Sequence, residues 1–526
     1  MARMTGRPIA TLALALLVAG RAACAEEPAA APKPWEQPAY LTRDDPVKVT
    51  EQDATDALRR IAELDDAGPR LNAVIAVNPD APQLARAALK AGLPLLGRTV
   101  LVKDNIEAKE WPTTAGSLAL KDNATGRDAP LIARLRKAGG VVLGKTNLSE
   151  WANIRSSKST SGWSAIGGLV KNPFATDRNA CGSSSGSGAA VAAGFAWAAI
   201  GTETDGSITC PASLNGIVGF KPTVGLVSRT HIVPISHSQD TAGPMANSVF
   251  DAALLLNAIA GSDPADPATA EAARHKTDFT ADLEGASLKG MRFGVLRKSV
   301  GNNPAVAALF EKTLGEMREA GAVLVEIDYE PDEAMGNDEF TVLLYELRED
   351  LGAYLRSSPA DIPVRSLADA IAFNKAHAEE EMRWFGQDVF EQAEAATDRT
   401  AYEKARANSL KLAGEDGIDR LLRENGVEFL IAPTNGPAWT SDLVNGDNYD
   451  GSIGAGSLAA IAGYPHLTLP MGDIERLPVG LSVIGRKWAD HEVLKAGAAI
   501  ENAVHRGGLS PFFEPWEGDL YSQPRE

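Results

Sequence analysis

One segment of the chain, residues 172–245, limits what this sequence can fold into more than any other. It is rich in Gly, Ser, Pro and Thr, yet residues 189–200 within it form an apolar run of small side chains. We expect that run to be a buried helix. A Gly/Ser loop that leads into a buried helix presents backbone N–H groups and hydroxyls inward. That placement suits tight packing or chemistry better than a flexible linker.

The rest of the chain alternates predicted strands with predicted helices. Runs of β-branched and aliphatic residues predict short strands, and apolar residues at helical spacing predict amphipathic helices. Strands mixed with helices indicate the α/β class. The expected strands lie at residues 99–102, 141–143, 428–431 and 479–484, and the expected helices at 50–64, 129–138, 339–355 and 376–395, the last two inside a charged helical stretch at 265–425.

Two glycine motifs match known functional motifs by residue identity alone. Residues 139–146 (GGVVLGKT) match the phosphate-binding pattern G-x-x-x-x-G-K-[ST], which requires a strand before the loop and a helix after it. Here a helix is predicted before the motif, and its middle, residues 141–143, predicts a strand. Its N–H groups would then be engaged in a sheet, so we predict no nucleotide site.

The second motif is residues 182–186 (GSSSG), which match the nucleophile elbow G-x-S-x-G and nominate Ser184. That motif requires a strand immediately before it, whereas residues 172–181 are expected to be a loop. An esterase that uses Ser184 and a late His remains an alternative, as does a non-catalytic periplasmic binding protein whose Gly/Ser loops hold a ligand. The candidate histidines are His466, His491 and His505.

Three consecutive segments carry a more specific signal. They are residues 181–194 (CGSSSGSGAAVAAG), 201–212 (GTETDGSITCPA) and 216–223 (GIVGFKPT), and together they resemble the amidase signature family of serine hydrolases. The resemblance spans about 50–500, and further family motifs follow in the expected order. These are LVKDNI around Lys103, TAGS at 114–117, GKTN at 144–147, NP at 172–173, GP at 243–244, GYP at 463–465 and LPVGL at 477–481.

The resemblance implies a fold and a set of site residues. The fold is a single large mixed β-sheet flanked by helices on both faces. The nucleophile is Ser207, the bridging serine is Ser183, expected after an unusual cis peptide, and the base is Lys103. A Lys acts as a base only when neutral, and burial lowers its pKa. The oxyanion hole would be formed by the backbone N–H groups of Thr204, Asp205, Gly206 and Ser207.

The sequence departs from the commonest family pattern at four positions. Cys181 and Ser185 replace glycines, Asp205 replaces the first Gly before the nucleophile, and Thr209 replaces the usual Arg. The form TETDGSITCPA looks more like bacterial peptide amidases than like tRNA-linked amidotransferase subunits. It implies hydrolysis of a carboxamide, expected to be the C-terminal amide of peptides, to a carboxylate and ammonia. A broad-specificity amidase for small acyl or aryl amides is the alternative within the family.

The N-terminus predicts export. Arg3 and Arg7 precede the apolar run 9–20, and the small residues Ala23-Cys24-Ala25 follow, which is typical of a secretory signal peptide cleaved after about Ala25. Lipidation of Cys24 would require an aliphatic residue where Arg21 stands. The chain is therefore divided into a signal peptide at 1–25, a Pro/Ala-rich linker at 26–46 and an amidase domain at 47–526. Within that domain, residues 265–425 are expected to form a variable helical region that shapes the substrate cleft.

Composition restricts the partners. The chain of 526 residues has 51 Lys and Arg against 69 Asp and Glu, a net charge of −18, which disfavours nucleic-acid binding. No apolar run is long enough for stable membrane insertion. Seven dispersed His and three Cys indicate no metal, and no organic cofactor or obligatory protein partner is indicated. A periplasmic or secreted location permits a disulfide between Cys181 and Cys210, a pairing that the sequence leaves open.

Overall fold

The computed structural model describes residues 51–455, 457–504 and 510–516. The predicted signal peptide at 1–25 and linker at 26–46 lie outside these residues. Most strands of the described chain belong to one sheet. They are β1 (Val74–Val77), β2 (Thr99–Lys103), β3 (Val141–Thr146), β8 (Ala198–Glu203), β9 (Val218–Lys221), β10 (Thr241–Ala246), β11 (Arg292–Leu296), β12 (Val323–Ile327), β13 (Phe429–Pro433), β14 (His466–Ile474) and β15 (Leu477–Ile484).

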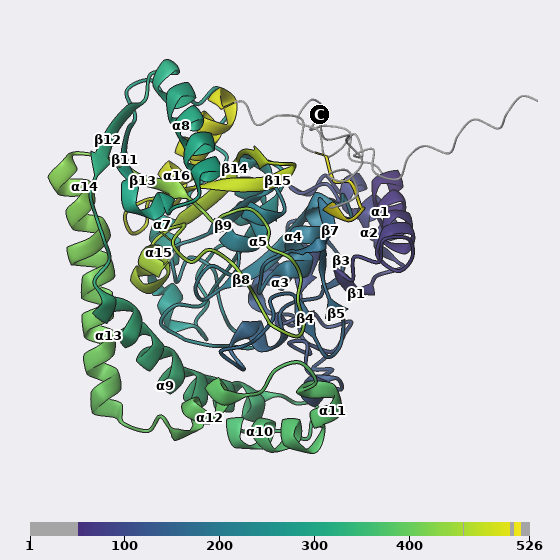
Figure 1. The fold of residues 1–526 in the computed structure, drawn as a ribbon. Coiled ribbons are helices and arrows are strands. Elements are labelled where there is room, and N and C mark those ends of the chain that lie inside the picture. The colour runs from purple at the N-terminus through teal and green to yellow at the C-terminus, as the bar shows by residue number, and fades with distance from the viewer. Residues whose placement is uncertain (1–50, 456, 505–509, 517–526) are drawn as a thin grey trace, which may run out of the picture.

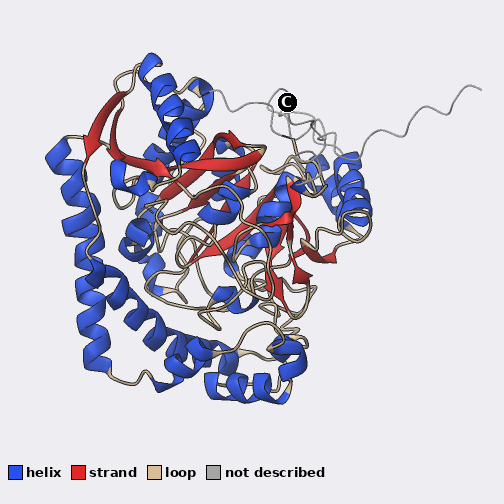
Figure 2. Ribbon diagram, in the orientation of Figure 1, coloured by secondary structure: helices blue, strands red, loops and turns tan. Residues whose placement is uncertain are grey.

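The sheet is mixed, and its order is β1-β3-β2-β8-β10-β9-β14-β15-β13-β11-β12. Strands β3, β2 and β8 are parallel, as are β13, β11 and β12, while the strands between these two groups pair antiparallel. Figure 2 shows the sheet crossing the middle of the molecule between helices. The predicted α/β class with a single large mixed sheet is confirmed.

Helices cover both faces of the sheet and extend beyond one end of it (Figure 1). They are α1 (Glu51–Leu64), α2 (Ala81–Lys90), α3 (Pro130–Lys137), α4 (Ser185–Ala192), α5 (Thr209–Leu214), α6 (Val249–Ile259), α7 (Ala272–His275), α8 (Pro304–Glu319), α9 (Glu333–Ser357), α10 (Leu367–Ala376), α11 (Ala378–Glu381), α12 (Asp388–Ala395), α13 (Arg399–Ala413), α14 (Arg420–Asn425), α15 (Ser457–Ala462) and α16 (Asp490–Ala503).

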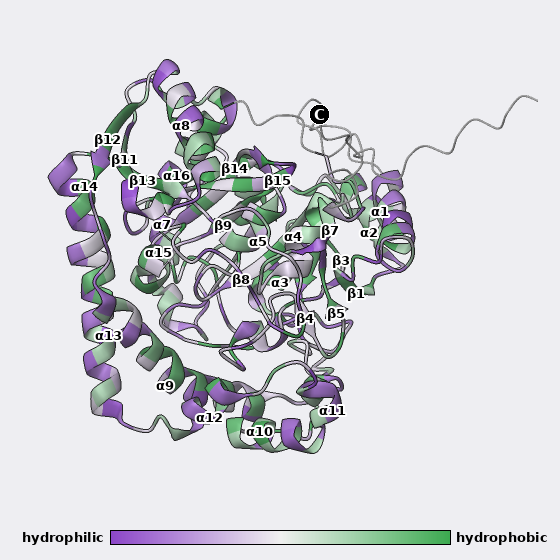
Figure 3. Ribbon diagram, viewed as in Figure 1, coloured by the Kyte–Doolittle hydropathy of each residue, from purple (hydrophilic) through white to green (hydrophobic). Residues whose placement is uncertain are grey.

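Two apolar layers enclose the sheet. Side chains of α3, α6, α8 and α16 pack with the strands in one cluster, and those of α1, α2 and α4 pack on the strands in another. Hydrophobic residues concentrate in the strands, while the outlying α13 and α14 carry many hydrophilic ones (Figure 3). Burying this apolar area on both faces is the main favourable contribution to folding. Among the described residues, no helix is both long and apolar enough to cross a bilayer.

The long helices α9 and α13 pack on each other, and with α10–α12 they form a helical lobe along one side and the base of the molecule (Figure 1). This lobe falls within the predicted charged helical stretch at 265–425. That stretch also contains two strands the sequence did not indicate, β11 and β12. Both strands are short and lie at one end of the sheet. There β11 pairs with β13, which follows the helical lobe in the sequence.

The single helix expected at 189–200 is wrong. Helix α4 ends at Ala192, Gly194 adopts a left-handed conformation with φ of +70°, and β8 begins at Ala198. The alanines of β8 favour a helix locally. Pairing with β2 on one side and β10 on the other overrides that preference.

The loop expected at 172–181 is also wrong in part, because Ala175–Asn179 forms β7. This strand pairs with β6 (Lys171–Asn172) in a small hairpin apart from the main sheet, and a second hairpin joins β4 (Trp163–Ser164) to β5 (Gly168–Leu169). The helix expected at 376–395 is interrupted between α11 and α12. Carbonyl groups at that break bond to the buried Arg155 instead of continuing a helix.

Candidate active site

Lys103 is the last residue of β2 and is fully buried. Its Nζ lies 2.7 Å from Ser183 Oγ and donates to Thr202 Oγ1 at 2.8 Å and to the Thr202 carbonyl at 3.2 Å. Desolvation lowers the pKa of Lys103 to about 7, and the nearby carboxylates of Asp240 and Glu203 only partly oppose that effect. A lysine in this setting is neutral in a substantial fraction at neutral pH.

Ser183 is buried beside Lys103 in the loop that opens α4. The Gly182–Ser183 peptide is cis, as expected from the family resemblance. The Ser183 carbonyl accepts the backbone N–H of Ser149 at 3.1 Å. Gly182 has no room for a side chain, since a Cβ there would lie 2.1 Å from Ser149 Oγ. The backbone of this loop is therefore pressed directly against the segment that carries Ser149.

Ser207 lies in the turn between β8 and α5 and is nine-tenths buried. The Ser184 backbone N–H donates to the Ser207 carbonyl at 3.1 Å, which joins this turn to the Ser183 loop. The Glu203 carboxylate accepts the backbone N–H groups of Ile208 and Thr209 at 2.7 and 2.9 Å. A carboxylate at a helix start satisfies donors that a serine cap would otherwise take, so Glu203 assumes the capping role.

The four residues nominated for the oxyanion hole form this same turn. Thr204 Oγ1 donates to Asp240 Oδ1 at 2.6 Å, and Asp205 Oδ2 accepts from Ser457 Oγ at 2.7 Å. Gly206 has φ of +76°, a left-handed conformation that favours glycine. Burial raises the pKa of Asp205 to about 6. The side chains of Thr204 and Asp205 are thus hydrogen-bonded to the loop before β10 and to α15, and these bonds restrain the turn.

A pocket opens beside Thr202, which accepts hydrogen bonds from Lys103. It lies between the end of β8, the start of β10 and the loop before β10. One wall is polar, and the other is an apolar stretch of that loop. The lining residues are Asn105, Ala152, Thr202, Thr204, Arg229, Ile232, Val233, Pro234, Ile235, Asp240 and Thr241.

The alternative nucleophile, Ser184, is engaged elsewhere. Its hydroxyl donates to the Thr202 carbonyl at 3.1 Å and accepts the Thr202 N–H at 3.2 Å. His466 Nε2 pairs with Ser482 Oγ, and His491 Nε2 with the Ala281 carbonyl. The third candidate, His505, lies outside the described residues. The described geometry does not assemble a Ser184–His pair.

Residues 141–146 of the phosphate-loop motif form β3, which confirms the strand predicted at 141–143. Lys145 is buried there, with its Nζ 2.7 Å from Asp104 Oδ1 and 2.8 Å from the Ile106 carbonyl. Its charge is already paired within the core, so this lysine is a structural element of the sheet.

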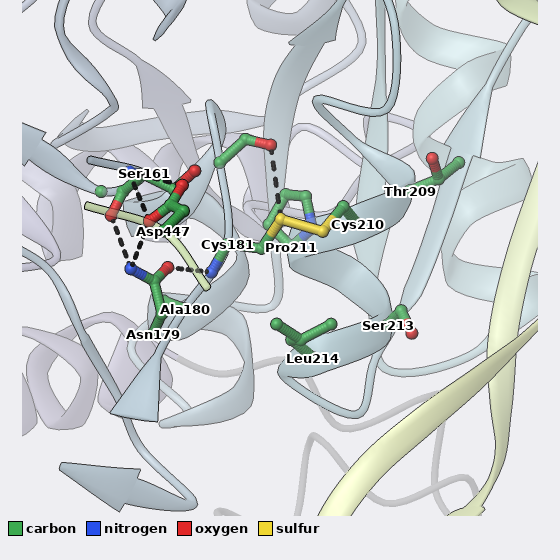
Figure 4. Close-up of a disulfide and its surroundings, with 12 residues drawn as sticks. Ser161, Asn179, Ala180, Cys181, Thr209, Cys210, Pro211, Ser213, Leu214 and Asp447 are labelled. Carbon is green, nitrogen blue, oxygen red and sulfur yellow. Dashed lines mark hydrogen bonds between the residues drawn. A yellow bond between two sulfur atoms is a disulfide. The ribbon is translucent and has the colours of Figure 1, made fainter. Parts of the chain in front are cut away.

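A disulfide joins Cys181 and Cys210, whose Cα atoms are 6.0 Å apart (Figure 4). The sequence left this pairing open. The structure also identifies four residues that contact Lys103, Ser183 or the turn around Ser207 and that the sequence did not indicate. They are Thr202, Glu203, Asp240 and Ser149. Thr202 and Glu203 lie in the segment GTETDGS, just before the proposed nucleophile. That position on a strand was the one sequence signal that could have identified them.

The sequence also matches known proteins over most of its length. The Amidase family model matches residues 55–494. The chain belongs to the amidase family. This amidase is 40% identical over 454 residues to a protein of Arabidopsis thaliana named "Probable amidase", covering 83% of this chain and 84% of the relative. A glutamyl-tRNA(Gln) amidotransferase chain of Thermus thermophilus is 34% identical over 478 residues, covering 86% of this chain and 93% of that relative.

Solved structures agree with that membership. The native peptide amidase of Stenotrophomonas maltophilia superposes on the amidase with a TM-score of 0.83 at 47% identity, covering 88% of this chain and 95% of that one. A peptide amidase bound to the competitive inhibitor chymostatin gives a TM-score of 0.84 at 47% identity, covering 88% and 96%. The protein is thus an amide hydrolase by family, and its fold is that of its relatives.

Proposed function

We propose that this amidase hydrolyses a carboxamide through an acyl-Ser207 intermediate, with Ser183 and Lys103 completing a Ser-Ser-Lys triad. The observation that carries the proposal is the 2.7 Å contact between Lys103 Nζ and Ser183 Oγ in a fully buried setting. Such a lysine can accept a proton near neutral pH, because burial disfavours its charged form.

Each proton has a defined route. Neutral Lys103 accepts the Ser183 proton while Ser183 takes the proton of Ser207, whose oxygen attacks the amide carbonyl carbon. The N–H groups of the turn from Thr204 to Ser207 stabilise the oxyanion, and one such donor typically contributes about 10²–10³ in rate. Ser183 then returns a proton to the leaving nitrogen, ammonia departs, and water attacks the acyl-serine by the same relay to release the carboxylate.

The proposed substrate is the C-terminal amide of a peptide. Support comes from the 47% identity to solved peptide amidases and from the segment TETDGSITCPA. The broader class of small acyl and aryl amides is the competing specificity. Ammonia release from a panel of peptide amides, measured beside simple acyl and aryl amides, separates the two by comparing kcat/KM.

The same proposal includes export to an oxidising compartment. The N-terminal pattern of charged, apolar and small residues supports it, and so does the pairing of Cys181 with Cys210, because disulfides persist mainly outside the cytosol. The residues of the predicted signal peptide lie outside those the structure describes.

The central experiment combines variants with covalent labelling. Ser207→Ala is expected to abolish turnover and labelling by a serine-directed fluorophosphonate, and Lys103→Ala to reduce turnover severely. Ser184→Ala is the matched control, because the Ser184 hydroxyl bonds to the Thr202 backbone and not to the relay, and this variant should label at Ser207. Near-normal turnover by purified Ser207→Ala, or a label mapped to another serine, would contradict the assignment.

A further inference from the structure

The Cys181–Cys210 disulfide joins the two chain segments that carry the proposed catalytic serines. Cys181 stands two residues before Ser183, and Cys210 stands three residues after Ser207. Figure 4 shows the bond bridging the loop before α4 and the first turn of α5. We propose that this disulfide positions Ser183 and Ser207 relative to each other, so that breaking it lowers turnover. The inference rests on the function proposed above.

On one side of the bond, the conformation of Cys181 depends on contacts from outside its own segment. Cys181 has φ of +56°, which L-residues rarely adopt. Its backbone N–H donates to Asn179 Oδ1 at 2.7 Å, and Asn179 Nδ2 donates to the Ser161 carbonyl at 2.9 Å. The Asn179 bridge and the disulfide therefore hold this residue from two directions, one residue before the Gly182–Ser183 peptide.

On the other side, Cys210 is bonded to the turn that carries the nucleophile. Its backbone N–H donates at 2.8 Å to the carbonyl of Gly206, the residue immediately before Ser207. The bond from Ser184 N–H to the Ser207 carbonyl is a second attachment between the two segments. The two attachments lie at residues 181 and 184, on either side of Ser183, and at Ser207 and Cys210 on the other segment. Together they restrain both the separation and the orientation of the loops, whereas one hydrogen bond leaves a rotation free.

The bond is enclosed by apolar side chains. Cys181 and Cys210 are 6% and 8% exposed, and they pack with residues from β7, α5, β15 and the loop after β13. These neighbours are Ala175, Leu214, Ala438 and Leu477. Reduction replaces the covalent link by two thiols in van der Waals contact, so the sulfur atoms and the segments behind them move apart.

The expected cost of that movement falls on catalysis. The relay requires Ser183 Oγ to reach both Lys103 Nζ and Ser207 Oγ, and a displacement of about 1 Å in such an arrangement can cost about 10²-fold in rate. Lys103 is held independently by Thr202 and does not touch the disulfide. We therefore expect kcat to fall while the pH midpoint of kcat/KM stays in place.

The test compares three proteins on one peptide amide: the wild type, the double variant Cys181→Ser/Cys210→Ser, and Leu214→Ala. Leu214 shares the apolar cluster on α5 but leaves the cross-link intact, so it controls for lost stability. The double variant should lose at least about tenfold in kcat, with little change in KM, and should label more slowly at Ser207. Leu214→Ala should lower the Tm but keep the wild-type kcat and the wild-type rate of labelling at Ser207.

Reduction of the folded wild type gives the same comparison without a mutation. Dithiothreitol supplies two electrons and two protons to the disulfide and leaves as its own cyclic disulfide. Activity should fall, return on reoxidation, and be insensitive to dithiothreitol in the double variant, with near-UV circular dichroism confirming that the chain stays folded. If the double variant does not fold, the reduction experiment alone tests the positioning role of the disulfide.

Two results would overturn the inference: a reduced or double-variant enzyme with kcat within about twofold of the wild type, or an equal loss of kcat in Leu214→Ala. The failure of the proposed function is distinguishable from both. A wild type that neither hydrolyses any amide in the panel nor labels at Ser207 rejects the proposed function and the positioning role together.

Discussion

At the scale of single residues, the burial of Lys103 sets the pH range in which the proposed relay can work. Desolvation holds the pKa of Lys103 at about 7, and only the neutral amine accepts a proton. We predict that kcat/KM rises with pH through about 7 and then levels off. Initial rates on a peptide amide between pH 5 and 9 measure this. A flat profile across that range would exclude Lys103 as the base.

Burial of Lys103 also makes a prediction about stability. Its folded pKa of about 7 lies below the unfolded value of 10.5, so between these values the unfolded chain binds more protons and stability rises with pH. Lys103→Met removes that dependence. From pH 7 to 9.5 the wild type should gain up to about 3 kcal/mol in the free energy of unfolding relative to Lys103→Met. Urea unfolding at each pH gives the difference, and parallel curves for the two proteins would contradict it.

Sequence alone could nominate the residues of the candidate site but not their surroundings. Ser183, Ser207 and Lys103 were predicted because the motifs around them resemble those of the amidase signature family. Glu203 and Asp240 were not, since their roles depend on contacts that folding creates. Glu203 caps α5 only because β8 ends beside it. Asp240 reaches Thr204 from a loop distant in the sequence.

At the scale of elements, the wrong predictions share one physical cause. The chain from α4 to β8 favours a continuous helix by local propensity, but pairing with β2 and β10 makes its second half a strand. The predicted helices α1 and α3 and the strands β2, β3, β13 and β15 were right, because each has a periodicity that agrees with its tertiary role. Where local propensity and tertiary packing favour different structures, the sequence pattern indicates only the local propensity.

The break between α11 and α12 illustrates how one buried side chain ends an element. Arg155 is fully buried, pairs with Glu150, and donates to the carbonyls of Glu381, Phe385 and Gly386. These bonds attach the helical lobe to the segment after β3. Burial and the neighbouring Glu381 raise the pKa of Glu150 well above its usual value, and Arg155 opposes that rise. Removing the guanidinium leaves Glu150 without its cationic partner and three carbonyls without a donor.

We therefore predict that Arg155→Leu destabilises the protein by about 3–5 kcal/mol, the typical cost of breaking a buried ion pair. The matched control is Arg399→Leu, which removes an exposed pair with Glu403 and should cost less than about 0.5 kcal/mol. Urea denaturation followed by circular dichroism measures both. Equal midpoints for the two variants would show that the lobe is held by other contacts.

At the scale of the whole molecule, the sheet order explains why the candidate site forms where it does. Strands β2 and β8 are neighbours in the sheet although the sequence separates them widely, and their parallel pairing brings Lys103 at the end of one beside Thr202 on the other. The loop that opens α4 then lies against both strands. A sequence pattern can show that each segment is a strand or a loop, but this adjacency arises only from the topology.

The proposed export of the chain can be tested through its processing and its thiols. Cleavage after about Ala25 would remove three Arg and no acidic residue, so the mature chain would be more acidic than the net charge of −18. The full chain expressed in a Gram-negative host should yield a periplasmic protein that begins near Glu26. Intact-mass analysis should find it two hydrogens lighter than its reduced form, with Cys181 and Cys210 protected from alkylation until reduction. Leu14→Arg, which breaks the apolar run, should leave an unprocessed precursor in the cytoplasm, whereas a wild-type chain that keeps its first residues there would reject export.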